Sequence, residues 1–196
     1  MPNAECLMPP LPLPFSSLLP PIRDVELTPP PSDYTTSLLT LLGNSDPFVV
    51  QGELVEALRG AIAGIAEVDL RRPEREGKWS ILQVVQHLTD NELVYGYRIR
   101  MMLTHEKPEL PRYDRDAWAA RLRYHDAPAG DVLEELGALR RRNLRLLQAL
   151  TPDELDRVGL HAERGEESVR TFISLVAGHD LLHRRQIDRI RKTLEL

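Results

Sequence analysis

The stretch that decides the fold is "VRTFISLVAGHDLLHRRQIDRI", residues 169–190, near the C-terminal end of the chain. Its apolar side chains recur at gaps of three and four residues, which is the pattern of an amphipathic helix with one buried face. His179 and His183 both fall on that face, where a core usually has leucine. We therefore predict a helix that begins after Ser168 and continues almost to the C-terminus. Its buried stripe is Phe172, Val176, His179, His183, Ile187, Ile190 and Leu194.

Two histidines four residues apart lie on one side of a helix, about 6 Å apart along its axis. Both imidazoles can then reach one ion, with metal–nitrogen bonds of about 2.0–2.1 Å. A third ligand must come from another segment. His87, in "VVQHLTDNE", is the best candidate because it borders a second apolar helical stripe. The other histidines, at positions 105, 125 and 161, lie near loops or beyond the apolar part of a helix.

The alternative is that these histidines are packed or hydrogen-bonded core residues, and spacing alone leaves it open. Three buried imidazoles without partners would cost roughly 1–3 kcal/mol each, and one shared divalent ion would satisfy all three. The stretch from His179 to His183 reads H-D-L-L-H, so it is not the H-E-x-x-H motif of zinc proteases.

Three more long amphipathic helices are predicted from the same periodicity. The first has Asp46 as its N-cap and Pro47 at its first position. The second runs from Ser80 to about residue 103, and the third follows Asp131 and ends near residue 150. Short helices are expected at 116–124 and after Thr151, where Glu154 completes a capping-box spacing.

These elements predict an all-α fold, a four-helix bundle. No segment shows the two-residue alternation of a strand, so little or no sheet is expected. The connection between the second and third long helices is about 28 residues, which is long enough for a crossover.

The N-terminal part of the chain has a different composition. Residues 1–32 hold ten of the sixteen prolines, and proline both removes a backbone donor and disfavours helix at the preceding residue. We predict a mobile or loosely docked tail over residues 1–44 and a folded bundle over 45–196. Two alternatives are that "PPLP" is a ligand for another domain and that "FSSLLPPI" packs on the bundle.

Composition excludes several classes of function. Among 196 residues the net charge is −5 and the pI about 5.7, so nucleic acid is not the expected partner. Cys6 is the one cysteine, so no intrachain disulfide forms. The apolar runs are far shorter than the ~20 residues of a membrane span. The N-terminus lacks the basic region of a signal peptide, and a cytoplasmic protein is expected.

Four segments together resemble one family. They are the W-S-x-x-x-V-x-x-H-L-x-D-x-E motif from Trp79 to Glu92, "LPRYDRDAWA", "LHAERGEESVR", and G-H-D-x-x-H-x-x-Q-I from Gly178 to Ile187. In this order they are similar to the DinB superfamily, and specifically to its YfiT-like branch, over roughly residues 45–193.

The resemblance implies a four-helix bundle with an overhand connection between helices two and three. It also implies a divalent metal, zinc or nickel, held by three histidines that map here to His87, His179 and His183. Members of the family often form homodimers. Their activities include thiol-cofactor transfer, maleylpyruvate isomerisation and hydrolysis.

Three neutral ligands leave a coordination position open for water or a substrate. We therefore expect a metal-dependent enzyme that activates water for hydrolysis, or a low-molecular-weight thiol for transfer to an electrophilic small molecule. The alternative is a helical module that binds a metal and a partner without turnover.

Several side chains are expected to support or line the site. Asp90, Asn91 and Gln186 each lie one turn from a histidine, while Tyr113 and Trp118 could cover the pocket from the long connection. Glu92 is expected to pair with an arginine, and Asp180 to be a surface group. His161 and Glu163 are expected either at the pocket mouth or in a loop turn.

Overall fold

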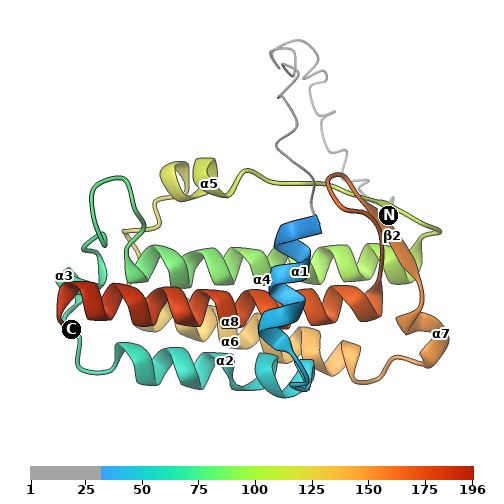
Figure 1. Ribbon diagram of the computed structural model, residues 1–196, viewed down its shortest axis with the longest axis horizontal. Coiled ribbons are helices and arrows are strands. Elements are labelled where there is room, and N and C mark those ends of the chain that lie inside the picture. The colour runs from blue at the N-terminus through green and yellow to red at the C-terminus, as the bar shows by residue number, and fades with distance from the viewer. Residues whose placement is uncertain (1–31) are drawn as a thin grey trace, which may run out of the picture.

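The computed structural model describes residues 32–196. Four long helices lie side by side, α2 (Pro47–Ile62), α4 (Ile81–Thr104), α6 (Ala129–Leu147) and α8 (Val169–Leu194), which confirms the predicted four-helix bundle (Figure 1). Three of them start at the predicted residues, because local side chains accept the free backbone N–H groups there. Asp46 Oδ1 accepts from the Phe48 N–H at 2.8 Å, Ser80 and Gln83 form a capping box, and Ser168 Oγ accepts from the Thr171 N–H.

The order of the long helices follows from the connection between α4 and α6. This connection returns along the length of the molecule and carries the short helix α5 (Arg115–Arg121), so α6 runs in the same direction as α4 (Figure 1). α2 packs against α6 and α8, and α4 packs against the same two helices. The bundle therefore has the predicted crossover in place of simple up-and-down topology.

A small sheet closes one end of the bundle. β1 (Glu109–Leu110) pairs in parallel with β2 (Val158–His161), which pairs antiparallel with β3 (Gly165–Ser168). The sheet ties the start of the long connection to the hairpin that leads into α8. Its strands have two to four residues, too short to give a clear alternating pattern. Two further short helices are α3 (Glu67–Leu70) and the capping-box helix α7 (Pro152–Leu155).

The structure corrects the predicted domain boundary. Residues 32–42, inside the predicted tail, form helix α1 (Ser32–Leu42), which crosses α8 (Figure 1). Leu38 and Leu42 are buried, so α1 is part of the fold and the tail prediction was too long at its C-terminal end. The proline-rich stretch, with "PPLP" and "FSSLLPPI", lies outside the described residues. No helix within residues 32–196 has the length and apolar character needed to cross a membrane.

A layer of buried polar residues divides the core in two. On one side, α4 and α8 contribute Leu88 and Ile187 to an apolar cluster. On the other side they contribute Tyr95 and Val176 to a second cluster. Between the clusters, every long helix contributes at least one buried polar residue: Gln51, Glu92, Arg140, Asn143 and Asp180.

α1 can cross α8 closely because residue 178 is glycine. A Cβ there would clash with the backbone carbonyl of Leu38. We predict that Gly178→Ala displaces α1 and lowers the free energy of unfolding by about 1–3 kcal/mol, the cost of overpacking. Gly52→Ala is the matched control, since a Cβ on this glycine of α2 meets open space and should stabilise the helix by up to about 1 kcal/mol. Denaturant unfolding of both variants checks this, and equal stabilities would contradict it.

Candidate metal centre

Three imidazoles from two helices converge on one point. His87 lies on α4, and His179 and His183 lie one turn apart on α8. The Nε2 atom of His179 is 3.3 Å from Nε2 of His87 and 3.0 Å from Nε2 of His183. One ligand atom from each of the three residues lies within 4.8 Å of the others. The structure therefore brings together the three histidines that the sequence selects.

The hydrogen bond of His183 fixes which of its nitrogens faces the cluster. Its Nδ1 lies 2.7 Å from Oε1 of Gln186, so Nδ1–H donates to the amide oxygen. A neutral imidazole has one N–H, so Nε2 of His183 then presents a lone pair to the other rings. Gln186 contacts a histidine as predicted, and this contact orients the ring as the outer partners of metal-bound histidines do.

Burial keeps all three imidazoles neutral. Desolvation lowers the pKa of His87 to about 3 and that of His183 to about 4. It also lowers the pKa of His179 well below the usual value, with the neighbouring histidines as the next cause. The positive charge of Arg115 on α5 lowers the pKa of each of the three. Metal binding by histidine requires the neutral form, so the site holds its candidate ligands in the required state.

Counting protons shows that a cation fits this cluster. His179 Nε2 is close to two other Nε2 atoms, and its single N–H can satisfy only one of them. The Nδ1 atoms of His87 and His179 are buried and lack a hydrogen-bond partner among the described residues, so no hydrogen bond at Nδ1 fixes the tautomer of either ring. Two bonds of about 2.0–2.1 Å at a tetrahedral angle would place nitrogens about 3.3 Å apart, close to both short distances here. Hydrogen bonds alone therefore leave at least one pair of Nε2 atoms in contact without a proton between them. A shared divalent ion would satisfy all three Nε2 lone pairs.

The other predicted pocket residues lie on or beside the long connection. The Tyr124 hydroxyl donates to Asp90, and Tyr113 donates to Asn91 Oδ1 at 3.4 Å. Asp90 and Asn91 therefore bind tyrosines of the connection, and the structure shows no bond from either to an imidazole. The rings of Tyr113 and Trp118 pack with centroids 4.5 Å apart. They form an aromatic pair on the connection. The hydrogen bond from Tyr113 to Asn91 joins this pair to α4 one turn beyond His87.

The ring that packs directly on a candidate ligand is Trp79, whose centroid is 5.1 Å from that of His87. Trp79 directly precedes Ser80, the N-cap of α4, so this ring contact follows from the motif that contains His87.

The remaining histidines stand apart from the cluster. His105 ends α4 and its Nδ1 lies 2.9 Å from the Thr104 hydroxyl. His125 is exposed on the connection. His161 is buried at the end of β2, where its Nδ1 accepts from the Glu163 N–H at 3.2 Å. For His161 and Glu163 the loop-turn alternative is therefore the correct one.

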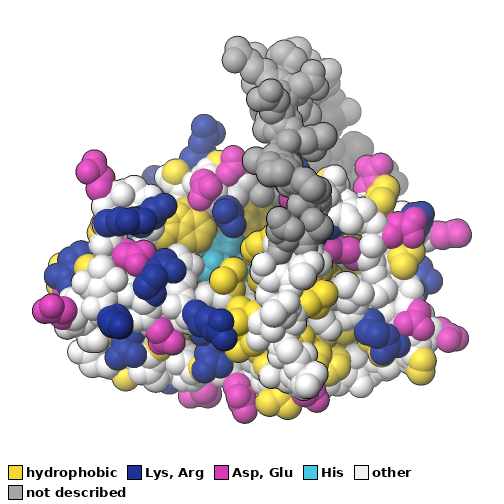
Figure 2. Space-filling model, viewed as in Figure 1, with side chains coloured by type: hydrophobic (Ala, Val, Ile, Leu, Met, Phe, Trp, Pro, Cys, Tyr) yellow, Lys and Arg dark blue, Asp and Glu magenta, His cyan; other side chains and the backbone are white. Residues whose placement is uncertain are grey.

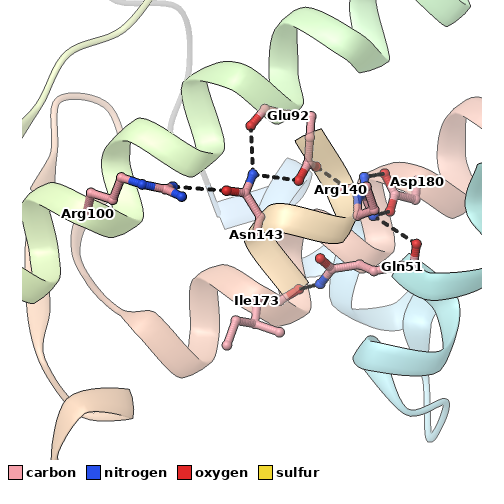
Figure 3. Close-up of polar contacts among 7 residues, drawn as sticks. All are labelled: Gln51, Glu92, Arg100, Arg140, Asn143, Ile173 and Asp180. Carbon is pink, nitrogen blue, oxygen red and sulfur yellow. Dashed lines mark hydrogen bonds and ion pairs between the residues drawn. The ribbon is translucent and has the colours of Figure 1, made fainter. Parts of the chain in front are cut away.

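The prediction for Asp180 was wrong, and the one for Glu92 is confirmed. Both carboxylates are fully buried and both pair with Arg140 of α6 (Figure 3). Arg140 and Asn143 were missed by the sequence analysis. The available signal was their spacing, because they continue the apolar stripe of α6 at gaps of three and four residues: Leu133, Leu136, Arg140, Asn143 and Leu147.

The cluster reaches the molecular surface on one side. His179 is partly exposed, while His87 and His183 are buried. Figure 2 shows histidine side chains at the floor of a hollow beside α1. A separate groove of about 350 Å³ lies between α1 and α8, and it is lined by other residues: Thr36, Ser37, Thr40, Leu41 and Arg185.

The crossover bundle and the convergent imidazoles define a four-helix-bundle protein with a three-histidine site. The chain belongs to the DinB superfamily, whose family model matches residues 53–187, and it is YfiT-like. It is 30% identical over 142 residues to a protein of Bacillus mycoides (strain KBAB4), and 31% identical to one of Bacillus cereus (strain B4264). Both are named "putative metal-dependent hydrolase", and both alignments cover 72% of this chain and 82% of the relative.

A solved structure agrees with this assignment. YfiT from Bacillus subtilis superimposes with a TM-score of 0.70 at 26% identity, over 74% of this chain and 84% of YfiT. That protein is described as a probable metal-dependent hydrolase with an unusual four-helix bundle topology.

The lowered histidine pKa values predict how the stability of the metal-free protein depends on pH. His183 has a pKa of about 4 in the fold and about 6.5 when unfolded, so the unfolded chain binds more protons between these values. Stability should therefore fall as pH decreases below about 6.5, with a contribution of up to about 1.4 kcal/mol per pH unit from each such histidine. Urea unfolding in excess chelator should show a smaller slope for His183→Leu than for the unchanged protein between pH 6.5 and 5. Parallel slopes would contradict the prediction.

Proposed function

We propose that this protein is a divalent-metal-dependent hydrolase that acts on a small molecule. The observation that carries the proposal is the convergence of three imidazoles, from α4 and α8, in a cluster in which His179 is partly exposed. The names of the relatives support the same class of activity.

The protein supplies the ligands and their orientation. Nε2 atoms of His87, His179 and His183 would hold the ion, and Gln186 fixes the ring of His183 through Nδ1. Three protein ligands are the number found in catalytic zinc sites, which keep a position for water or substrate. A divalent ion at such a site lowers the pKa of bound water or thiol and polarises a substrate carbonyl.

Thiol transfer is the second candidate function, and the state of Asp90 favours it. Hydrolysis profits from a free carboxylate that accepts a proton, but Asp90 already accepts the Tyr124 hydroxyl hydrogen. A thiol is deprotonated by metal coordination itself, so transfer from a low-molecular-weight thiol would need less from the surrounding side chains. Zinc and nickel both accept imidazole ligands.

We predict one divalent ion per chain and its loss in His183→Ala. The protein is purified without a histidine tag, loaded with Zn²⁺ or Ni²⁺, dialysed and analysed for metal. His125→Ala is the matched control, because His125 is exposed on the connection. The control should keep a ratio near one. Equal metal content in His183→Ala and the control would contradict the site.

We predict turnover that depends on the same residues. Metal-loaded protein is screened against a panel of esters and amides, and in parallel against electrophiles with low-molecular-weight thiols. Product formation should fall by at least ~100-fold in His183→Ala, since loss of the ion removes the activating group. Turnover in the first panel supports the hydrolase, and turnover only with a thiol supports the transferase. Metal binding without turnover in either panel would contradict both and favour a non-catalytic binding module.

A further inference from the structure

We propose that Arg140 is the positioning residue of the metal centre. Its guanidinium joins the helix that carries His87 to the helix that carries His179 and His183, and so fixes how the two sets of imidazoles meet. The inference rests on the proposed metal site and names the interaction that keeps its ligands in place.

The contacts of Arg140 reach all the long helices (Figure 3). Its Nη1 and Nη2 atoms lie 2.6 and 3.1 Å from the two carboxylate oxygens of Asp180 on α8. Nε lies 2.8 Å from Oε2 of Glu92 on α4. Nη1 also donates to the backbone carbonyl of Gln51 on α2, at 3.3 Å. The planar fork of one arginine from α6 therefore fixes the distance and angle of Asp180 and donates to the backbone of α2. It holds Glu92 by an ion pair, because Nε and Oε2 are close but form no hydrogen bond.

The two carboxylates are close in sequence to the candidate ligands. Asp180 follows His179 directly, and its side chain points about 100° away around the helix. Glu92 lies five residues beyond His87, between a turn and a turn and a half along α4. A rotation of α8 that moved Asp180 from Arg140 would carry His179 with it. Ligand groups must be held to within about 0.5 Å of their working geometry, so a small rotation would matter.

A second set of contacts holds the Glu92 end of the network. Asn143 Nδ2 donates to Oε1 of Glu92 at 2.7 Å and to the Glu92 backbone carbonyl at 3.2 Å. Arg100 Nη1 donates to Asn143 Oδ1 at 2.9 Å. Gly96 makes room for this amide, because a Cβ at residue 96 would lie 2.6 Å from it. The small residue therefore lets α6 approach α4 closely enough to hold Glu92.

Stability alone is a weak reason for a buried network of this kind. Replacing a buried ion pair or triad by apolar residues of similar volume is often neutral or stabilising. What apolar packing lacks is direction, whereas a bidentate arginine–carboxylate pair fixes both distance and angle. This network lies beside His179, at the level between the two apolar clusters. Its position indicates that it fixes the relative orientation of the helices that carry the histidines.

Asp180→Asn and Arg140→Lys test the proposal, since each keeps approximate size but removes the bidentate charged pair. Leu133→Ala is the control: it should also destabilise α6, but Leu133 belongs to an apolar cluster that contains none of the network residues. Gly96→Ala is a milder variant that pushes Asn143 away from Glu92 and changes no charge. All are studied as full-length protein, with folding checked by circular dichroism and thermal unfolding.

Two readouts separate positioning from general stability. The first is the affinity for Co²⁺ and the visible absorption spectrum of the Co²⁺ protein, which reports coordination geometry. The second is the set of histidine ring ¹⁵N chemical shifts in the metal-free protein. We expect Asp180→Asn and Arg140→Lys to weaken Co²⁺ binding by about 10-fold or more, to change the spectrum and to move the His179 resonances. Leu133→Ala should leave all three close to those of the unchanged protein.

The outcomes distinguish this inference from the proposed function. If the network variants keep Co²⁺ affinity, spectrum and His179 shifts like Leu133→Ala, Arg140 is structural only and the inference is wrong while the metal site stands. If the unchanged protein fails to bind Co²⁺, the proposed function is wrong, and the metal-free ¹⁵N shifts still decide whether Arg140 positions His179. If Arg140→Lys fails to fold, Asp180→Asn and Gly96→Ala give the same comparison.

Discussion

One buried guanidinium determines how the four long helices meet. Arg140 pairs with Glu92 of α4 and Asp180 of α8 and donates to the backbone of α2, with each side chain almost fully removed from water. Burial raises the pKa of both carboxyls, and the charge of Arg140 opposes that shift. Several kcal/mol are needed to bury each ion, so the arrangement is tolerable only when all partners stay in place. The network therefore restricts sliding and rotation more strictly than the apolar clusters on either side.

The histidine cluster depends on this restriction. Its members come from α4 and α8, so their nitrogens converge only if these helices keep one relative rotation. The crossover connection contributes in a different way, since it lies along α4 and brings Tyr113, Arg115 and Trp118 to the side of His87. The bundle thus holds the candidate ligands from within, and the connection supplies the aromatic and charged surroundings.

Local chemistry made much of the structure predictable. Side-chain caps such as Asp46 and Ser80 marked helix starts, and apolar periodicity marked the buried faces that include His87 and His183. Gln186 followed from helical spacing alone. The small sheet was not predicted because its strands are so short, and α1 was not predicted because it follows a run of prolines. Asp180 was misplaced because its partner is 40 residues away on another helix, and one sequence does not show which distant charges pair.

The most direct test of the account is anomalous diffraction from crystals of the untagged, metal-loaded protein, measured at the absorption edge of the loaded metal. The account predicts one strong peak per chain, about 2.0–2.1 Å from the Nε2 atoms of His87, His179 and His183, with at least one further ligand that is not a protein atom. A peak bound by other residues, or three histidine rings joined only by hydrogen bonds with no peak between them, would contradict it.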